Sequence, residues 1–245
     1  MSFIPIFKNG LILKQHMLEA LRDYPLDYVN ITFSGMGDGV ITGLDVVIGE
    51  DDSFFLNGGI VKIDGNIYLV NQSEQMFFNE QENFVYLKIT KKEEIDGIGY
   101  CTEIVQKSEE DNSLFEVFRY IKNAKVKKYV SIDEVFADVT NRINQRKLKK
   151  SIQGGSTLCD EYYHLFARSI LKSKCAQIKD IAFAYQCLNT IINIEIVKEY
   201  FGIEDLSNDS LLVAMENIAK KIPSSIEEHK KEESKLEKKR KILVD

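Results

Sequence analysis

The sequence predicts an α+β protein, with an N-terminal antiparallel β-sandwich or partly open barrel followed by a C-terminal α-helical bundle. Residues 39–70 alternate apolar with small or polar side chains, and a period of two is typical of strands. Beyond residues 122–128, glycine becomes rare and the apolar period lengthens to about 3.6, which is typical of helices. The 245 residues are 44% hydrophobic, enough to fill a core. We therefore expect a β-rich platform domain at 1–125 and an α-helical domain with a polar C-terminal helix at 126–245.

The N-terminal segment is expected to be short and mixed. Residues 3–13 combine apolar side chains with a turn at Asn9-Gly10, which predicts an extended piece, a turn and the start of a helix. The helical spacing continues to Leu21, and Tyr24-Pro25 is expected to end the helix, because a residue before proline disfavours helical geometry. Residues 29–33 are then expected to form a short strand.

Turn residues divide the alternating stretch into successive strands. The breaks fall at residues 49–53, 57–59 and 64–66. The last break contains Asp64-Gly65, which suits the positive φ angles of a two-residue type I′ hairpin. We expect the side chains before this turn to pair with those after it: Ile60, Val61 and Ile63 with Ile67, Leu69 and Val70.

Four further strands are expected before the change of period. They are residues 75–78, 84–90, 101–106 and 114–121, with a polar turn at 108–113. This makes about eight strands in all, within the range of a sandwich or partly open barrel.

The first predicted helix of the C-terminal half starts at residues 131–134, where a serine cap precedes acidic residues. Val135, Val139 and Ile143 line one face at a spacing of four. Gly154-Gly155 are expected to end it. Four basic residues near this end suit the helix dipole, with a nucleic-acid patch as the alternative: Arg146, Lys147, Lys149 and Lys150.

Three more helices and a polar tail are expected to follow. Ser156 or Thr157 caps a helix that runs through Leu171, a long apolar helix spans residues 179–201 and ends at Gly202, and another spans 207–221. The broad apolar stripe of the long helix makes it the expected centre of the bundle. The tail at 224–245 has few apolar residues and would fray alone, so we expect other subunits of an assembly to hold it.

Charge and cysteine content narrow the classes of function. The net charge of −6 gives the whole chain no electrostatic affinity for nucleic acid or anionic membranes. The cysteines Cys101, Cys159, Cys175 and Cys187 form no C-x-x-C pair, which predicts buried free thiols in a reducing compartment and no zinc site. We find no signal-peptide pattern and no apolar run long enough to span a membrane, and expect synthesis in the cytoplasm without direct membrane insertion.

Two motifs invite a ligand-binding interpretation. Gly35, Gly37 and Gly39 resemble a dinucleotide loop, but their spacing differs from G-x-G-x-x-G and a strand follows where phosphate binding needs a helix. The acidic residues 50–52 lack the alternating ligands of a calcium loop. A glycine-rich connection and a solvated turn are the favoured interpretations.

The three histidines, His16, His164 and His229, lie on separate segments, and no serine sits in a G-x-S-x-G elbow. Glu19 follows His16 on one short helix without a third ligand nearby, and His164 lies five residues after Cys159, on another side of a helix. We therefore expect no catalytic, cofactor-binding or metal-binding residues. An enzyme whose cleft holds His16 or His164 beside two carboxylates stays open as an alternative.

Two stretches resemble proteins of contractile injection systems. Residues 7–16, FKNGLILKQH, are similar to the W-x-E-G-L-x-L-x-P-Q-H opening of the TssK family of type VI secretion baseplate subunits, whose shoulder is a β-sandwich. Phe7, Asn9 and Lys14 replace the tryptophan, acid and proline of that pattern. Residues 39–70 resemble a G-V-x-x-G-L-x-V … D-G pattern of contractile-tail baseplate proteins.

This resemblance covers about the first 70 residues and implies a non-enzymatic structural subunit of a phage, prophage or bacteriocin tail. It implies docking to other baseplate or tail proteins or to fibres, a homo-oligomer, with a trimer favoured, and assembly into a tail-like particle. The alternative is a cytoplasmic chaperone or regulatory protein that binds one partner through its C-terminal helices.

Overall fold

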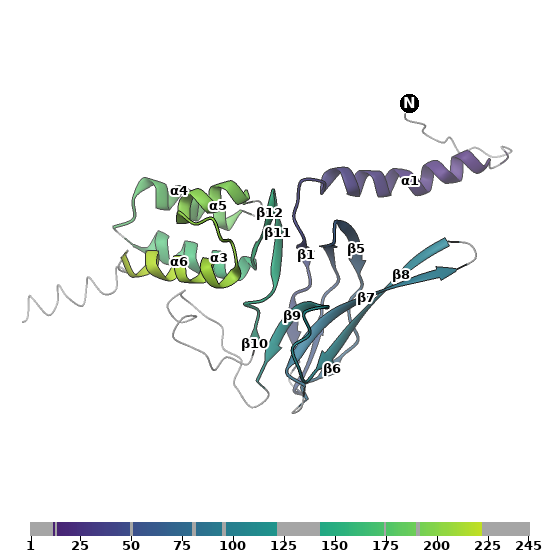
Figure 1. The fold of residues 1–245 in the computed structure, drawn as a ribbon, viewed down its shortest axis with the longest axis horizontal. Helices are drawn as coiled ribbons and strands as arrows, with labels where there is room; N and C mark the ends of the chain where they lie inside the picture. Colours follow the sequence, from purple (N-terminus) through teal and green to yellow (C-terminus); the bar gives the residue numbers. More distant parts are fainter. Residues whose placement is uncertain are drawn as a thin grey trace, which may run out of the picture.

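A computed structural model describes residues 12, 14–49, 51–79, 82–94, 97–121, 143–173, 175–189 and 192–221. Figure 1 shows a β-rich part, a helix across one end of it, and a group of helices beside the hairpin of β11 and β12. The α+β class is confirmed. The described helices are α1 (Gln15–Thr32), α3 (Asp160–Lys172), α4 (Ile178–Leu188), α5 (Ile194–Phe201) and α6 (Asn208–Lys221).

The strands form three sheets with open strand orders, so no closed barrel is present among the described residues. The five-stranded sheet has the order β12-β11-β1-β4-β5, the four-stranded sheet β10-β9-β7-β8, and the three-stranded sheet β2-β3-β6. β11 runs parallel to β1, and the other pairs are antiparallel. The strands are β1 (Gly39–Gly43), β2 (Val46–Ile48), β3 (Ser53–Leu56), β4 (Gly59–Ile63), β5 (Asn66–Val70), β6 (Met76–Phe77), β7 (Phe84–Glu94), β8 (Gly97–Lys107), β9 (Phe115–Tyr120), β10 (Ile143–Asn144), β11 (Lys149–Ile152) and β12 (Gly155–Leu158).

The predicted hairpin is confirmed as β4 and β5. Ile60 faces Leu69 and Ile63 faces Asn66 across the turn. Asp64 and Gly65 have φ angles of 50° and 76°, as the type I′ turn requires. The four later strands are confirmed as β6 to β9, and β7 and β8 extend beyond the predicted segments into a long two-stranded arm (Figure 1).

Helix α1 corrects the predicted N-terminal arrangement. The helix continues through Pro25 to Thr32, so both the predicted end at Tyr24-Pro25 and the predicted strand at 29–33 are wrong. Proline removes one backbone donor and disfavours helical geometry before it, but those local costs are outweighed at the helix end. There Lys62, distant in sequence, donates hydrogen bonds to the carbonyl oxygens of Phe33, Ser34 and Met36.

The predicted helix ending at Gly154-Gly155 is also wrong over its described part, because residues 143–158 contribute β10, β11 and β12. Gly154, with φ 86°, makes the β11–β12 turn. The basic residues there do not cap a helix; the Lys150 ammonium lies 2.6 Å from the Asp160 carboxylate. Strand β11 pairs with β1, where Val40 lies opposite Lys150. Local periodicity cannot predict this pairing, because the two residues are far apart in the sequence.

The later helices are partly as predicted. Ser156 and Thr157 lie in β12, and α3 begins after Cys159 instead. The predicted long helix is two helices, α4 and α5, and Asn193 caps the second by accepting a hydrogen bond from the backbone of Glu195 (2.8 Å). Gly202 ends α5 in the left-handed conformation, as expected, and α6 confirms the last predicted helix.

All three sheets and the C-terminal helices contribute to one hydrophobic core. Phe54, Val61 and Phe118 represent the three sheets, and Phe166 and Val197 the helices, each with no solvent exposure. The helices are therefore fixed against the β-rich part by shared apolar packing. Residues 1–11, 122–142 and 222–245, which include the predicted domain boundary and the polar tail, lie outside the described part of the chain.

Candidate functional site

An exposed apolar surface lies on α1. Leu21, Tyr24, Tyr28 and Ile31 are exposed by 49, 72, 63 and 74% of their areas. The helix lies across one end of the β-rich part (Figure 1), and no other described helix or strand packs along it. Exposed apolar side chains that gather in this way typically mark an interaction surface.

Lys62 of β4 holds the end of α1 against the sheet. Its ammonium, on a side chain only 9% exposed, donates to the carbonyl oxygens of Phe33 (3.2 Å), Ser34 (3.3 Å) and Met36 (2.6 Å). A cation at this place gives hydrogen bonds to carbonyl oxygens of the segment that follows the helix and suits the negative end of the helix dipole. The exposed helix is thus anchored to the sheet at its C-terminal end.

The glycine run links α1 to the β11–β12 hairpin by close backbone packing. A Cβ on Gly37 would lie 2.2 Å from the carbonyl carbon of Gly155, and one on Gly39 would lie 2.7 Å from the Lys149 carbonyl oxygen. Ser151 also donates to the Gly37 carbonyl (2.5 Å). The glycines therefore permit a contact that larger residues would prevent, and Gly39 is the first residue of strand β1.

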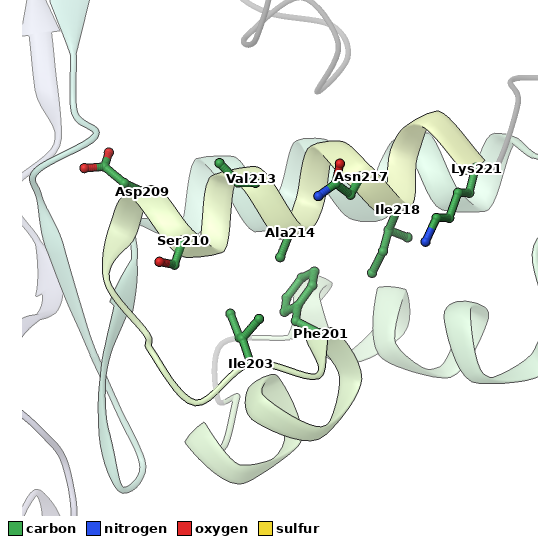
Figure 2. A pocket seen from close by; sticks show the side chains of 9 residues that line it. All are labelled: Phe201, Ile203, Asp209, Ser210, Val213, Ala214, Asn217, Ile218 and Lys221. Carbon is green, nitrogen blue, oxygen red and sulfur yellow. The ribbon is translucent and has the colours of Figure 1, made fainter.

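A second apolar surface is a groove between α5 and α6. Its volume is about 550 Å³. Figure 2 shows Phe201 and Ile203 directed toward α6, with Ala214 and Ile218 directed toward them. Val213 also lines the groove but lies on the far side of α6 from Phe201 in this view. Asp209, Ser210, Asn217 and Lys221 provide its polar rim. An apolar floor with a polar rim is suited to an apolar side chain of a partner segment.

The groove is supported from behind by a buried aromatic and acidic pair. The Tyr200 ring stacks on Phe183 with ring centroids 3.8 Å apart, and its hydroxyl donates to Asp180 Oδ1 (3.0 Å). The other Asp180 oxygen accepts from the Gln177 backbone (2.9 Å), which caps α4. Burial raises the pKa of Tyr200. Asp180 therefore has a structural task at a helix start.

A smaller cavity of about 140 Å³ lies between β1 and the start of α3. Lys150 pairs with Asp160 at its edge, and Cys159 is buried in its wall. Burial raises the pKa of the Cys159 thiol to about 12, so the thiol stays protonated at neutral pH and is a poor nucleophile. The expectation of four buried thiols is wrong in part, because Cys101 and Cys175 are exposed.

The structure does not bring together the residues considered as catalytic candidates. His16 is exposed on α1, where Glu19 accepts a hydrogen bond from Gln15 (2.8 Å), and His164 is half-buried on α3. Asp51 of the acidic turn accepts from Ser53 and from Gln75 (3.0 Å), and the Ser53 hydrogen bond lowers the pKa of Asp51.

Among the residues that the structure describes, no three His, Cys, Asp or Glu side chains gather to hold a metal ion. Within the same part of the chain, no helix combines the length and apolarity needed to cross a bilayer.

Sequence reasoning missed both apolar surfaces. The sequence does indicate the α1 face, since apolar residues recur at steps of three and four: Leu21, Tyr24, Tyr28 and Ile31. It was missed because the helix was predicted to end at Pro25. The groove carried none, because its two walls come from separate elements.

No protein-family model matches the sequence, and no curated protein matches it significantly. Among solved structures, the chain is similar to one described as "Crystal structure of TssK", with 9% sequence identity and a TM-score of 0.37. The match covers 91% of this chain and 70% of that chain. A TM-score of this size marks a distant likeness in the arrangement of elements, and function does not follow from it.

Proposed function

We propose that the protein is a non-enzymatic structural subunit of a phage-tail-like contractile baseplate. It docks neighbouring baseplate or fibre proteins, forms a homo-oligomer through its helices, and is made in the cytoplasm before assembly into a tail or tail-like particle. The exposed apolar face of α1, anchored by Lys62 on a rigid sheet, is the observation that carries the proposal. The resemblance of residues 7–16 and 39–70 to baseplate proteins supplies the class of assembly.

The use of buried polar side chains supports a structural role over a catalytic one. Each buried polar or charged side chain of the described residues makes a hydrogen bond to the backbone or to a neighbouring side chain; these are Ser53, Lys62, Ser151, Thr157 and Asp180. Such groups fix turns, caps and strand contacts. A trimer is proposed from the sequence resemblance.

The groove between α5 and α6 favours a second candidate, a cytoplasmic chaperone or regulatory protein acting through its C-terminal helices. Phe201, Ile203, Val213 and Ile218 are apolar residues that line this groove of about 550 Å³. Charge substitution in the groove separates the two candidates. A chaperone would lose its partner on Val213→Lys, whereas a subunit docking through α1 would retain its neighbours.

The decisive experiment is recovery of the tagged full chain from its own cells, with its partners identified by mass spectrometry and its mass measured by sedimentation. The proposal expects co-purification with tail-tube, sheath or baseplate proteins, and an oligomer. A stable monomer without tail proteins would contradict it. Recovery with one soluble partner that is lost on Val213→Lys would favour the chaperone or regulator.

A further inference from the structure

The groove between α5 and α6 changes in character along its length. At one end Asp209 lines it, and Asp205 accepts a hydrogen bond from the groove residue Ser210 (2.6 Å). The middle is formed by half-buried apolar side chains: Phe201, Ile203, Ala214 and Ile218. Lys221 lies at the other end, where α6 finishes (Figure 2). The groove therefore passes from acidic through apolar to basic.

The sequence beyond α6 carries the complementary order of side chains in one short stretch. Residues 238–245 are KKRKILVD, which is four basic residues, three apolar residues and one acidic residue. Laid along the groove in one direction, residues 238–241 meet its acidic end, residues 242–244 meet its apolar middle and Asp245 meets Lys221. The opposite direction would bring the four basic residues to Lys221, which is unfavourable.

The dimensions of the stretch and of the groove agree. Asp209 and Lys221 lie on one helix, and its rise per residue places them about 18 Å apart. An extended chain advances about 3.3 Å per residue, so residues 238–245 cover about 23 Å. The stretch can therefore present its basic, apolar and acidic parts to the matching parts of the groove at the same time.

The chain between α6 and this stretch has a length that favours docking within one molecule. Residues 222–241 connect Lys221 to Ile242. A flexible chain of this length has a root-mean-square span of about 25 Å, and a helix of this length spans about 30 Å, so either reaches the acidic end of the groove. A tether whose span is close to the distance required gives an effective concentration of about millimolar. A partner segment from solution lacks this advantage.

We propose that residues 242–244 dock in the α5–α6 groove of their own chain, with residues 238–241 over its acidic end. The stretch is then a built-in occupant that any partner segment must displace. Burial of three apolar side chains is offset in part by closing the loop and ordering the stretch, so docking is reversible, with the groove filled about nine-tenths of the time. The inference is independent of the proposed baseplate role, because it concerns one chain alone.

Disulfide trapping in the full chain tests the position of the stretch. Ala214→Cys in the groove is combined with Leu243→Cys or, as the matched control, with Leu236→Cys, in a background with Cys101→Ser and Cys175→Ser; the two remaining cysteines are buried. An undocked chain would link Leu236→Cys faster, because its loop to residue 214 is shorter. Docking reverses this order, so Leu243→Cys should link within one chain on the order of 10-fold faster under oxidised glutathione.

Charge reversal tests the direction of docking. Lys239→Glu with Lys241→Glu should slow the trapping of Leu243→Cys on the order of 10-fold, because carboxylates would then meet the acidic end of the groove. Adding Asp209→Lys should restore part of the rate. Lys230→Glu with Lys231→Glu is the control, since it makes the same change of charge outside the complementary stretch and should leave the rate unchanged.

Binding of an apolar fluorescent dye tests whether the groove is occupied. The triple variant Ile242→Ser, Leu243→Ser, Val244→Ser should bind the dye on the order of 10-fold more tightly than the wild type, because an occupant that fills the groove about nine-tenths of the time is removed. Adding Ala214→Lys should abolish the increase, which locates it in the groove. Leu236→Ser should leave dye binding unchanged, and circular dichroism should show the same fold in each variant.

The outcomes separate the chain's own stretch from other occupants. Faster trapping of Leu243→Cys within one chain, slowed and restored by the charge changes, supports the inference. Faster trapping of Leu236→Cys, or unchanged dye binding in the triple variant, would overturn it. Disulfides between two chains would also overturn it, because the stretch would then occupy the groove of a second copy. The baseplate role is decided separately, by co-purification with tail proteins.

Discussion

The ammonium of Lys62 lies 2.6 Å from the carbonyl oxygen of Met36, just beyond the end of α1. This contact joins strand β4, which pairs with β1 and β5, to the segment that leads from α1 into β1. It places a positive charge where a helix presents carbonyl oxygens and the negative end of its dipole. Lys62 therefore helps to fix the position of the exposed helix, together with the hydrogen bond from the Gly154 backbone to the Gly35 carbonyl (2.8 Å).

Replacing Lys62 with methionine should lower the free energy of unfolding by about 1–3 kcal/mol, because three carbonyl groups lose a hydrogen bond from a charged donor. Urea denaturation followed by fluorescence or circular dichroism measures the change. Lys88→Met is the control, since Lys88 is exposed on β7 and should change stability by under about 0.5 kcal/mol. Equal effects of the two substitutions would show that Lys62 does not anchor α1.

The glycine run should tolerate substitution far less than the hairpin glycine. In Gly37→Ala the new Cβ meets the Gly155 backbone at 2.2 Å. Neither side can move freely, because Gly155 lies in the paired strand β12 and the Gly37 N–H donates to the Ile152 carbonyl (3.1 Å). We expect a loss of about 3 kcal/mol or more. Gly65→Ala has open space around its Cβ and only its positive φ to strain, so it should cost about 1 kcal/mol. Thermal unfolding compares them, and a smaller effect at Gly37 would contradict the close packing.

Local periodicity was sufficient for the β4–β5 hairpin and for strands β6 to β9. The β4–β5 hairpin was predictable down to its Asp64-Gly65 turn, since the alternation and the turn residues lie within a few positions. Strand β11 was not, because its sequence also suits a helix; its partner β12 is adjacent, but its other partner β1 lies about a hundred residues earlier. The end of α1 was also predicted wrongly, because Lys62, which binds the segment after the helix, lies on a strand that is distant in the sequence.

Thiol reactivity should divide the cysteines into two classes. Cys101 and Cys175 are exposed, whereas Cys159 and Cys187 are buried with thiol pKa values raised by burial to about 12. An aromatic disulfide reagent at pH 8 should therefore modify Cys101 and Cys175 in the native protein, and all four cysteines in denaturant. Peptide mapping identifies the modified residues. Rapid native modification of Cys159 would mean that the β1–α3 cavity opens.

The same two buried thiols should make stability fall as pH rises above about 9. Their ordinary pKa is 9.0 and their folded pKa is about 12, so between these values the unfolded chain releases thiol protons that the folded chain retains. Each thiol should remove about 1 kcal/mol of stability at pH 10 relative to pH 8. Lysines and tyrosines also ionise there, so the measurement is the difference between the wild type and the double variant Cys159→Ala, Cys187→Ala. An identical pH slope in both would exclude this contribution.

The pair of Asp180 and Tyr200 should behave as a coupled unit behind the groove. Tyr200→Phe removes the donor to Asp180 Oδ1 and should cost about 1–2 kcal/mol, whereas Asp180→Ala also removes the α4 cap and should cost about 2–3 kcal/mol. The double variant should cost less than the sum, by about 1 kcal/mol, because both single changes break the same hydrogen bond.

Tyr185→Phe is the matched control for that cycle, since Tyr185 is 58% exposed on the same helix and should have little effect on stability. The consequence extends to the groove, because Phe201 lines it and also packs edge-on against Tyr200, with ring centroids 5.1 Å apart. Asp180→Ala should therefore loosen the Phe201 wall and increase binding of an apolar fluorescent dye, while Tyr185→Phe should not. If the two single effects on stability were additive and dye binding were unchanged, Asp180 would be coupled neither to Tyr200 nor to the groove.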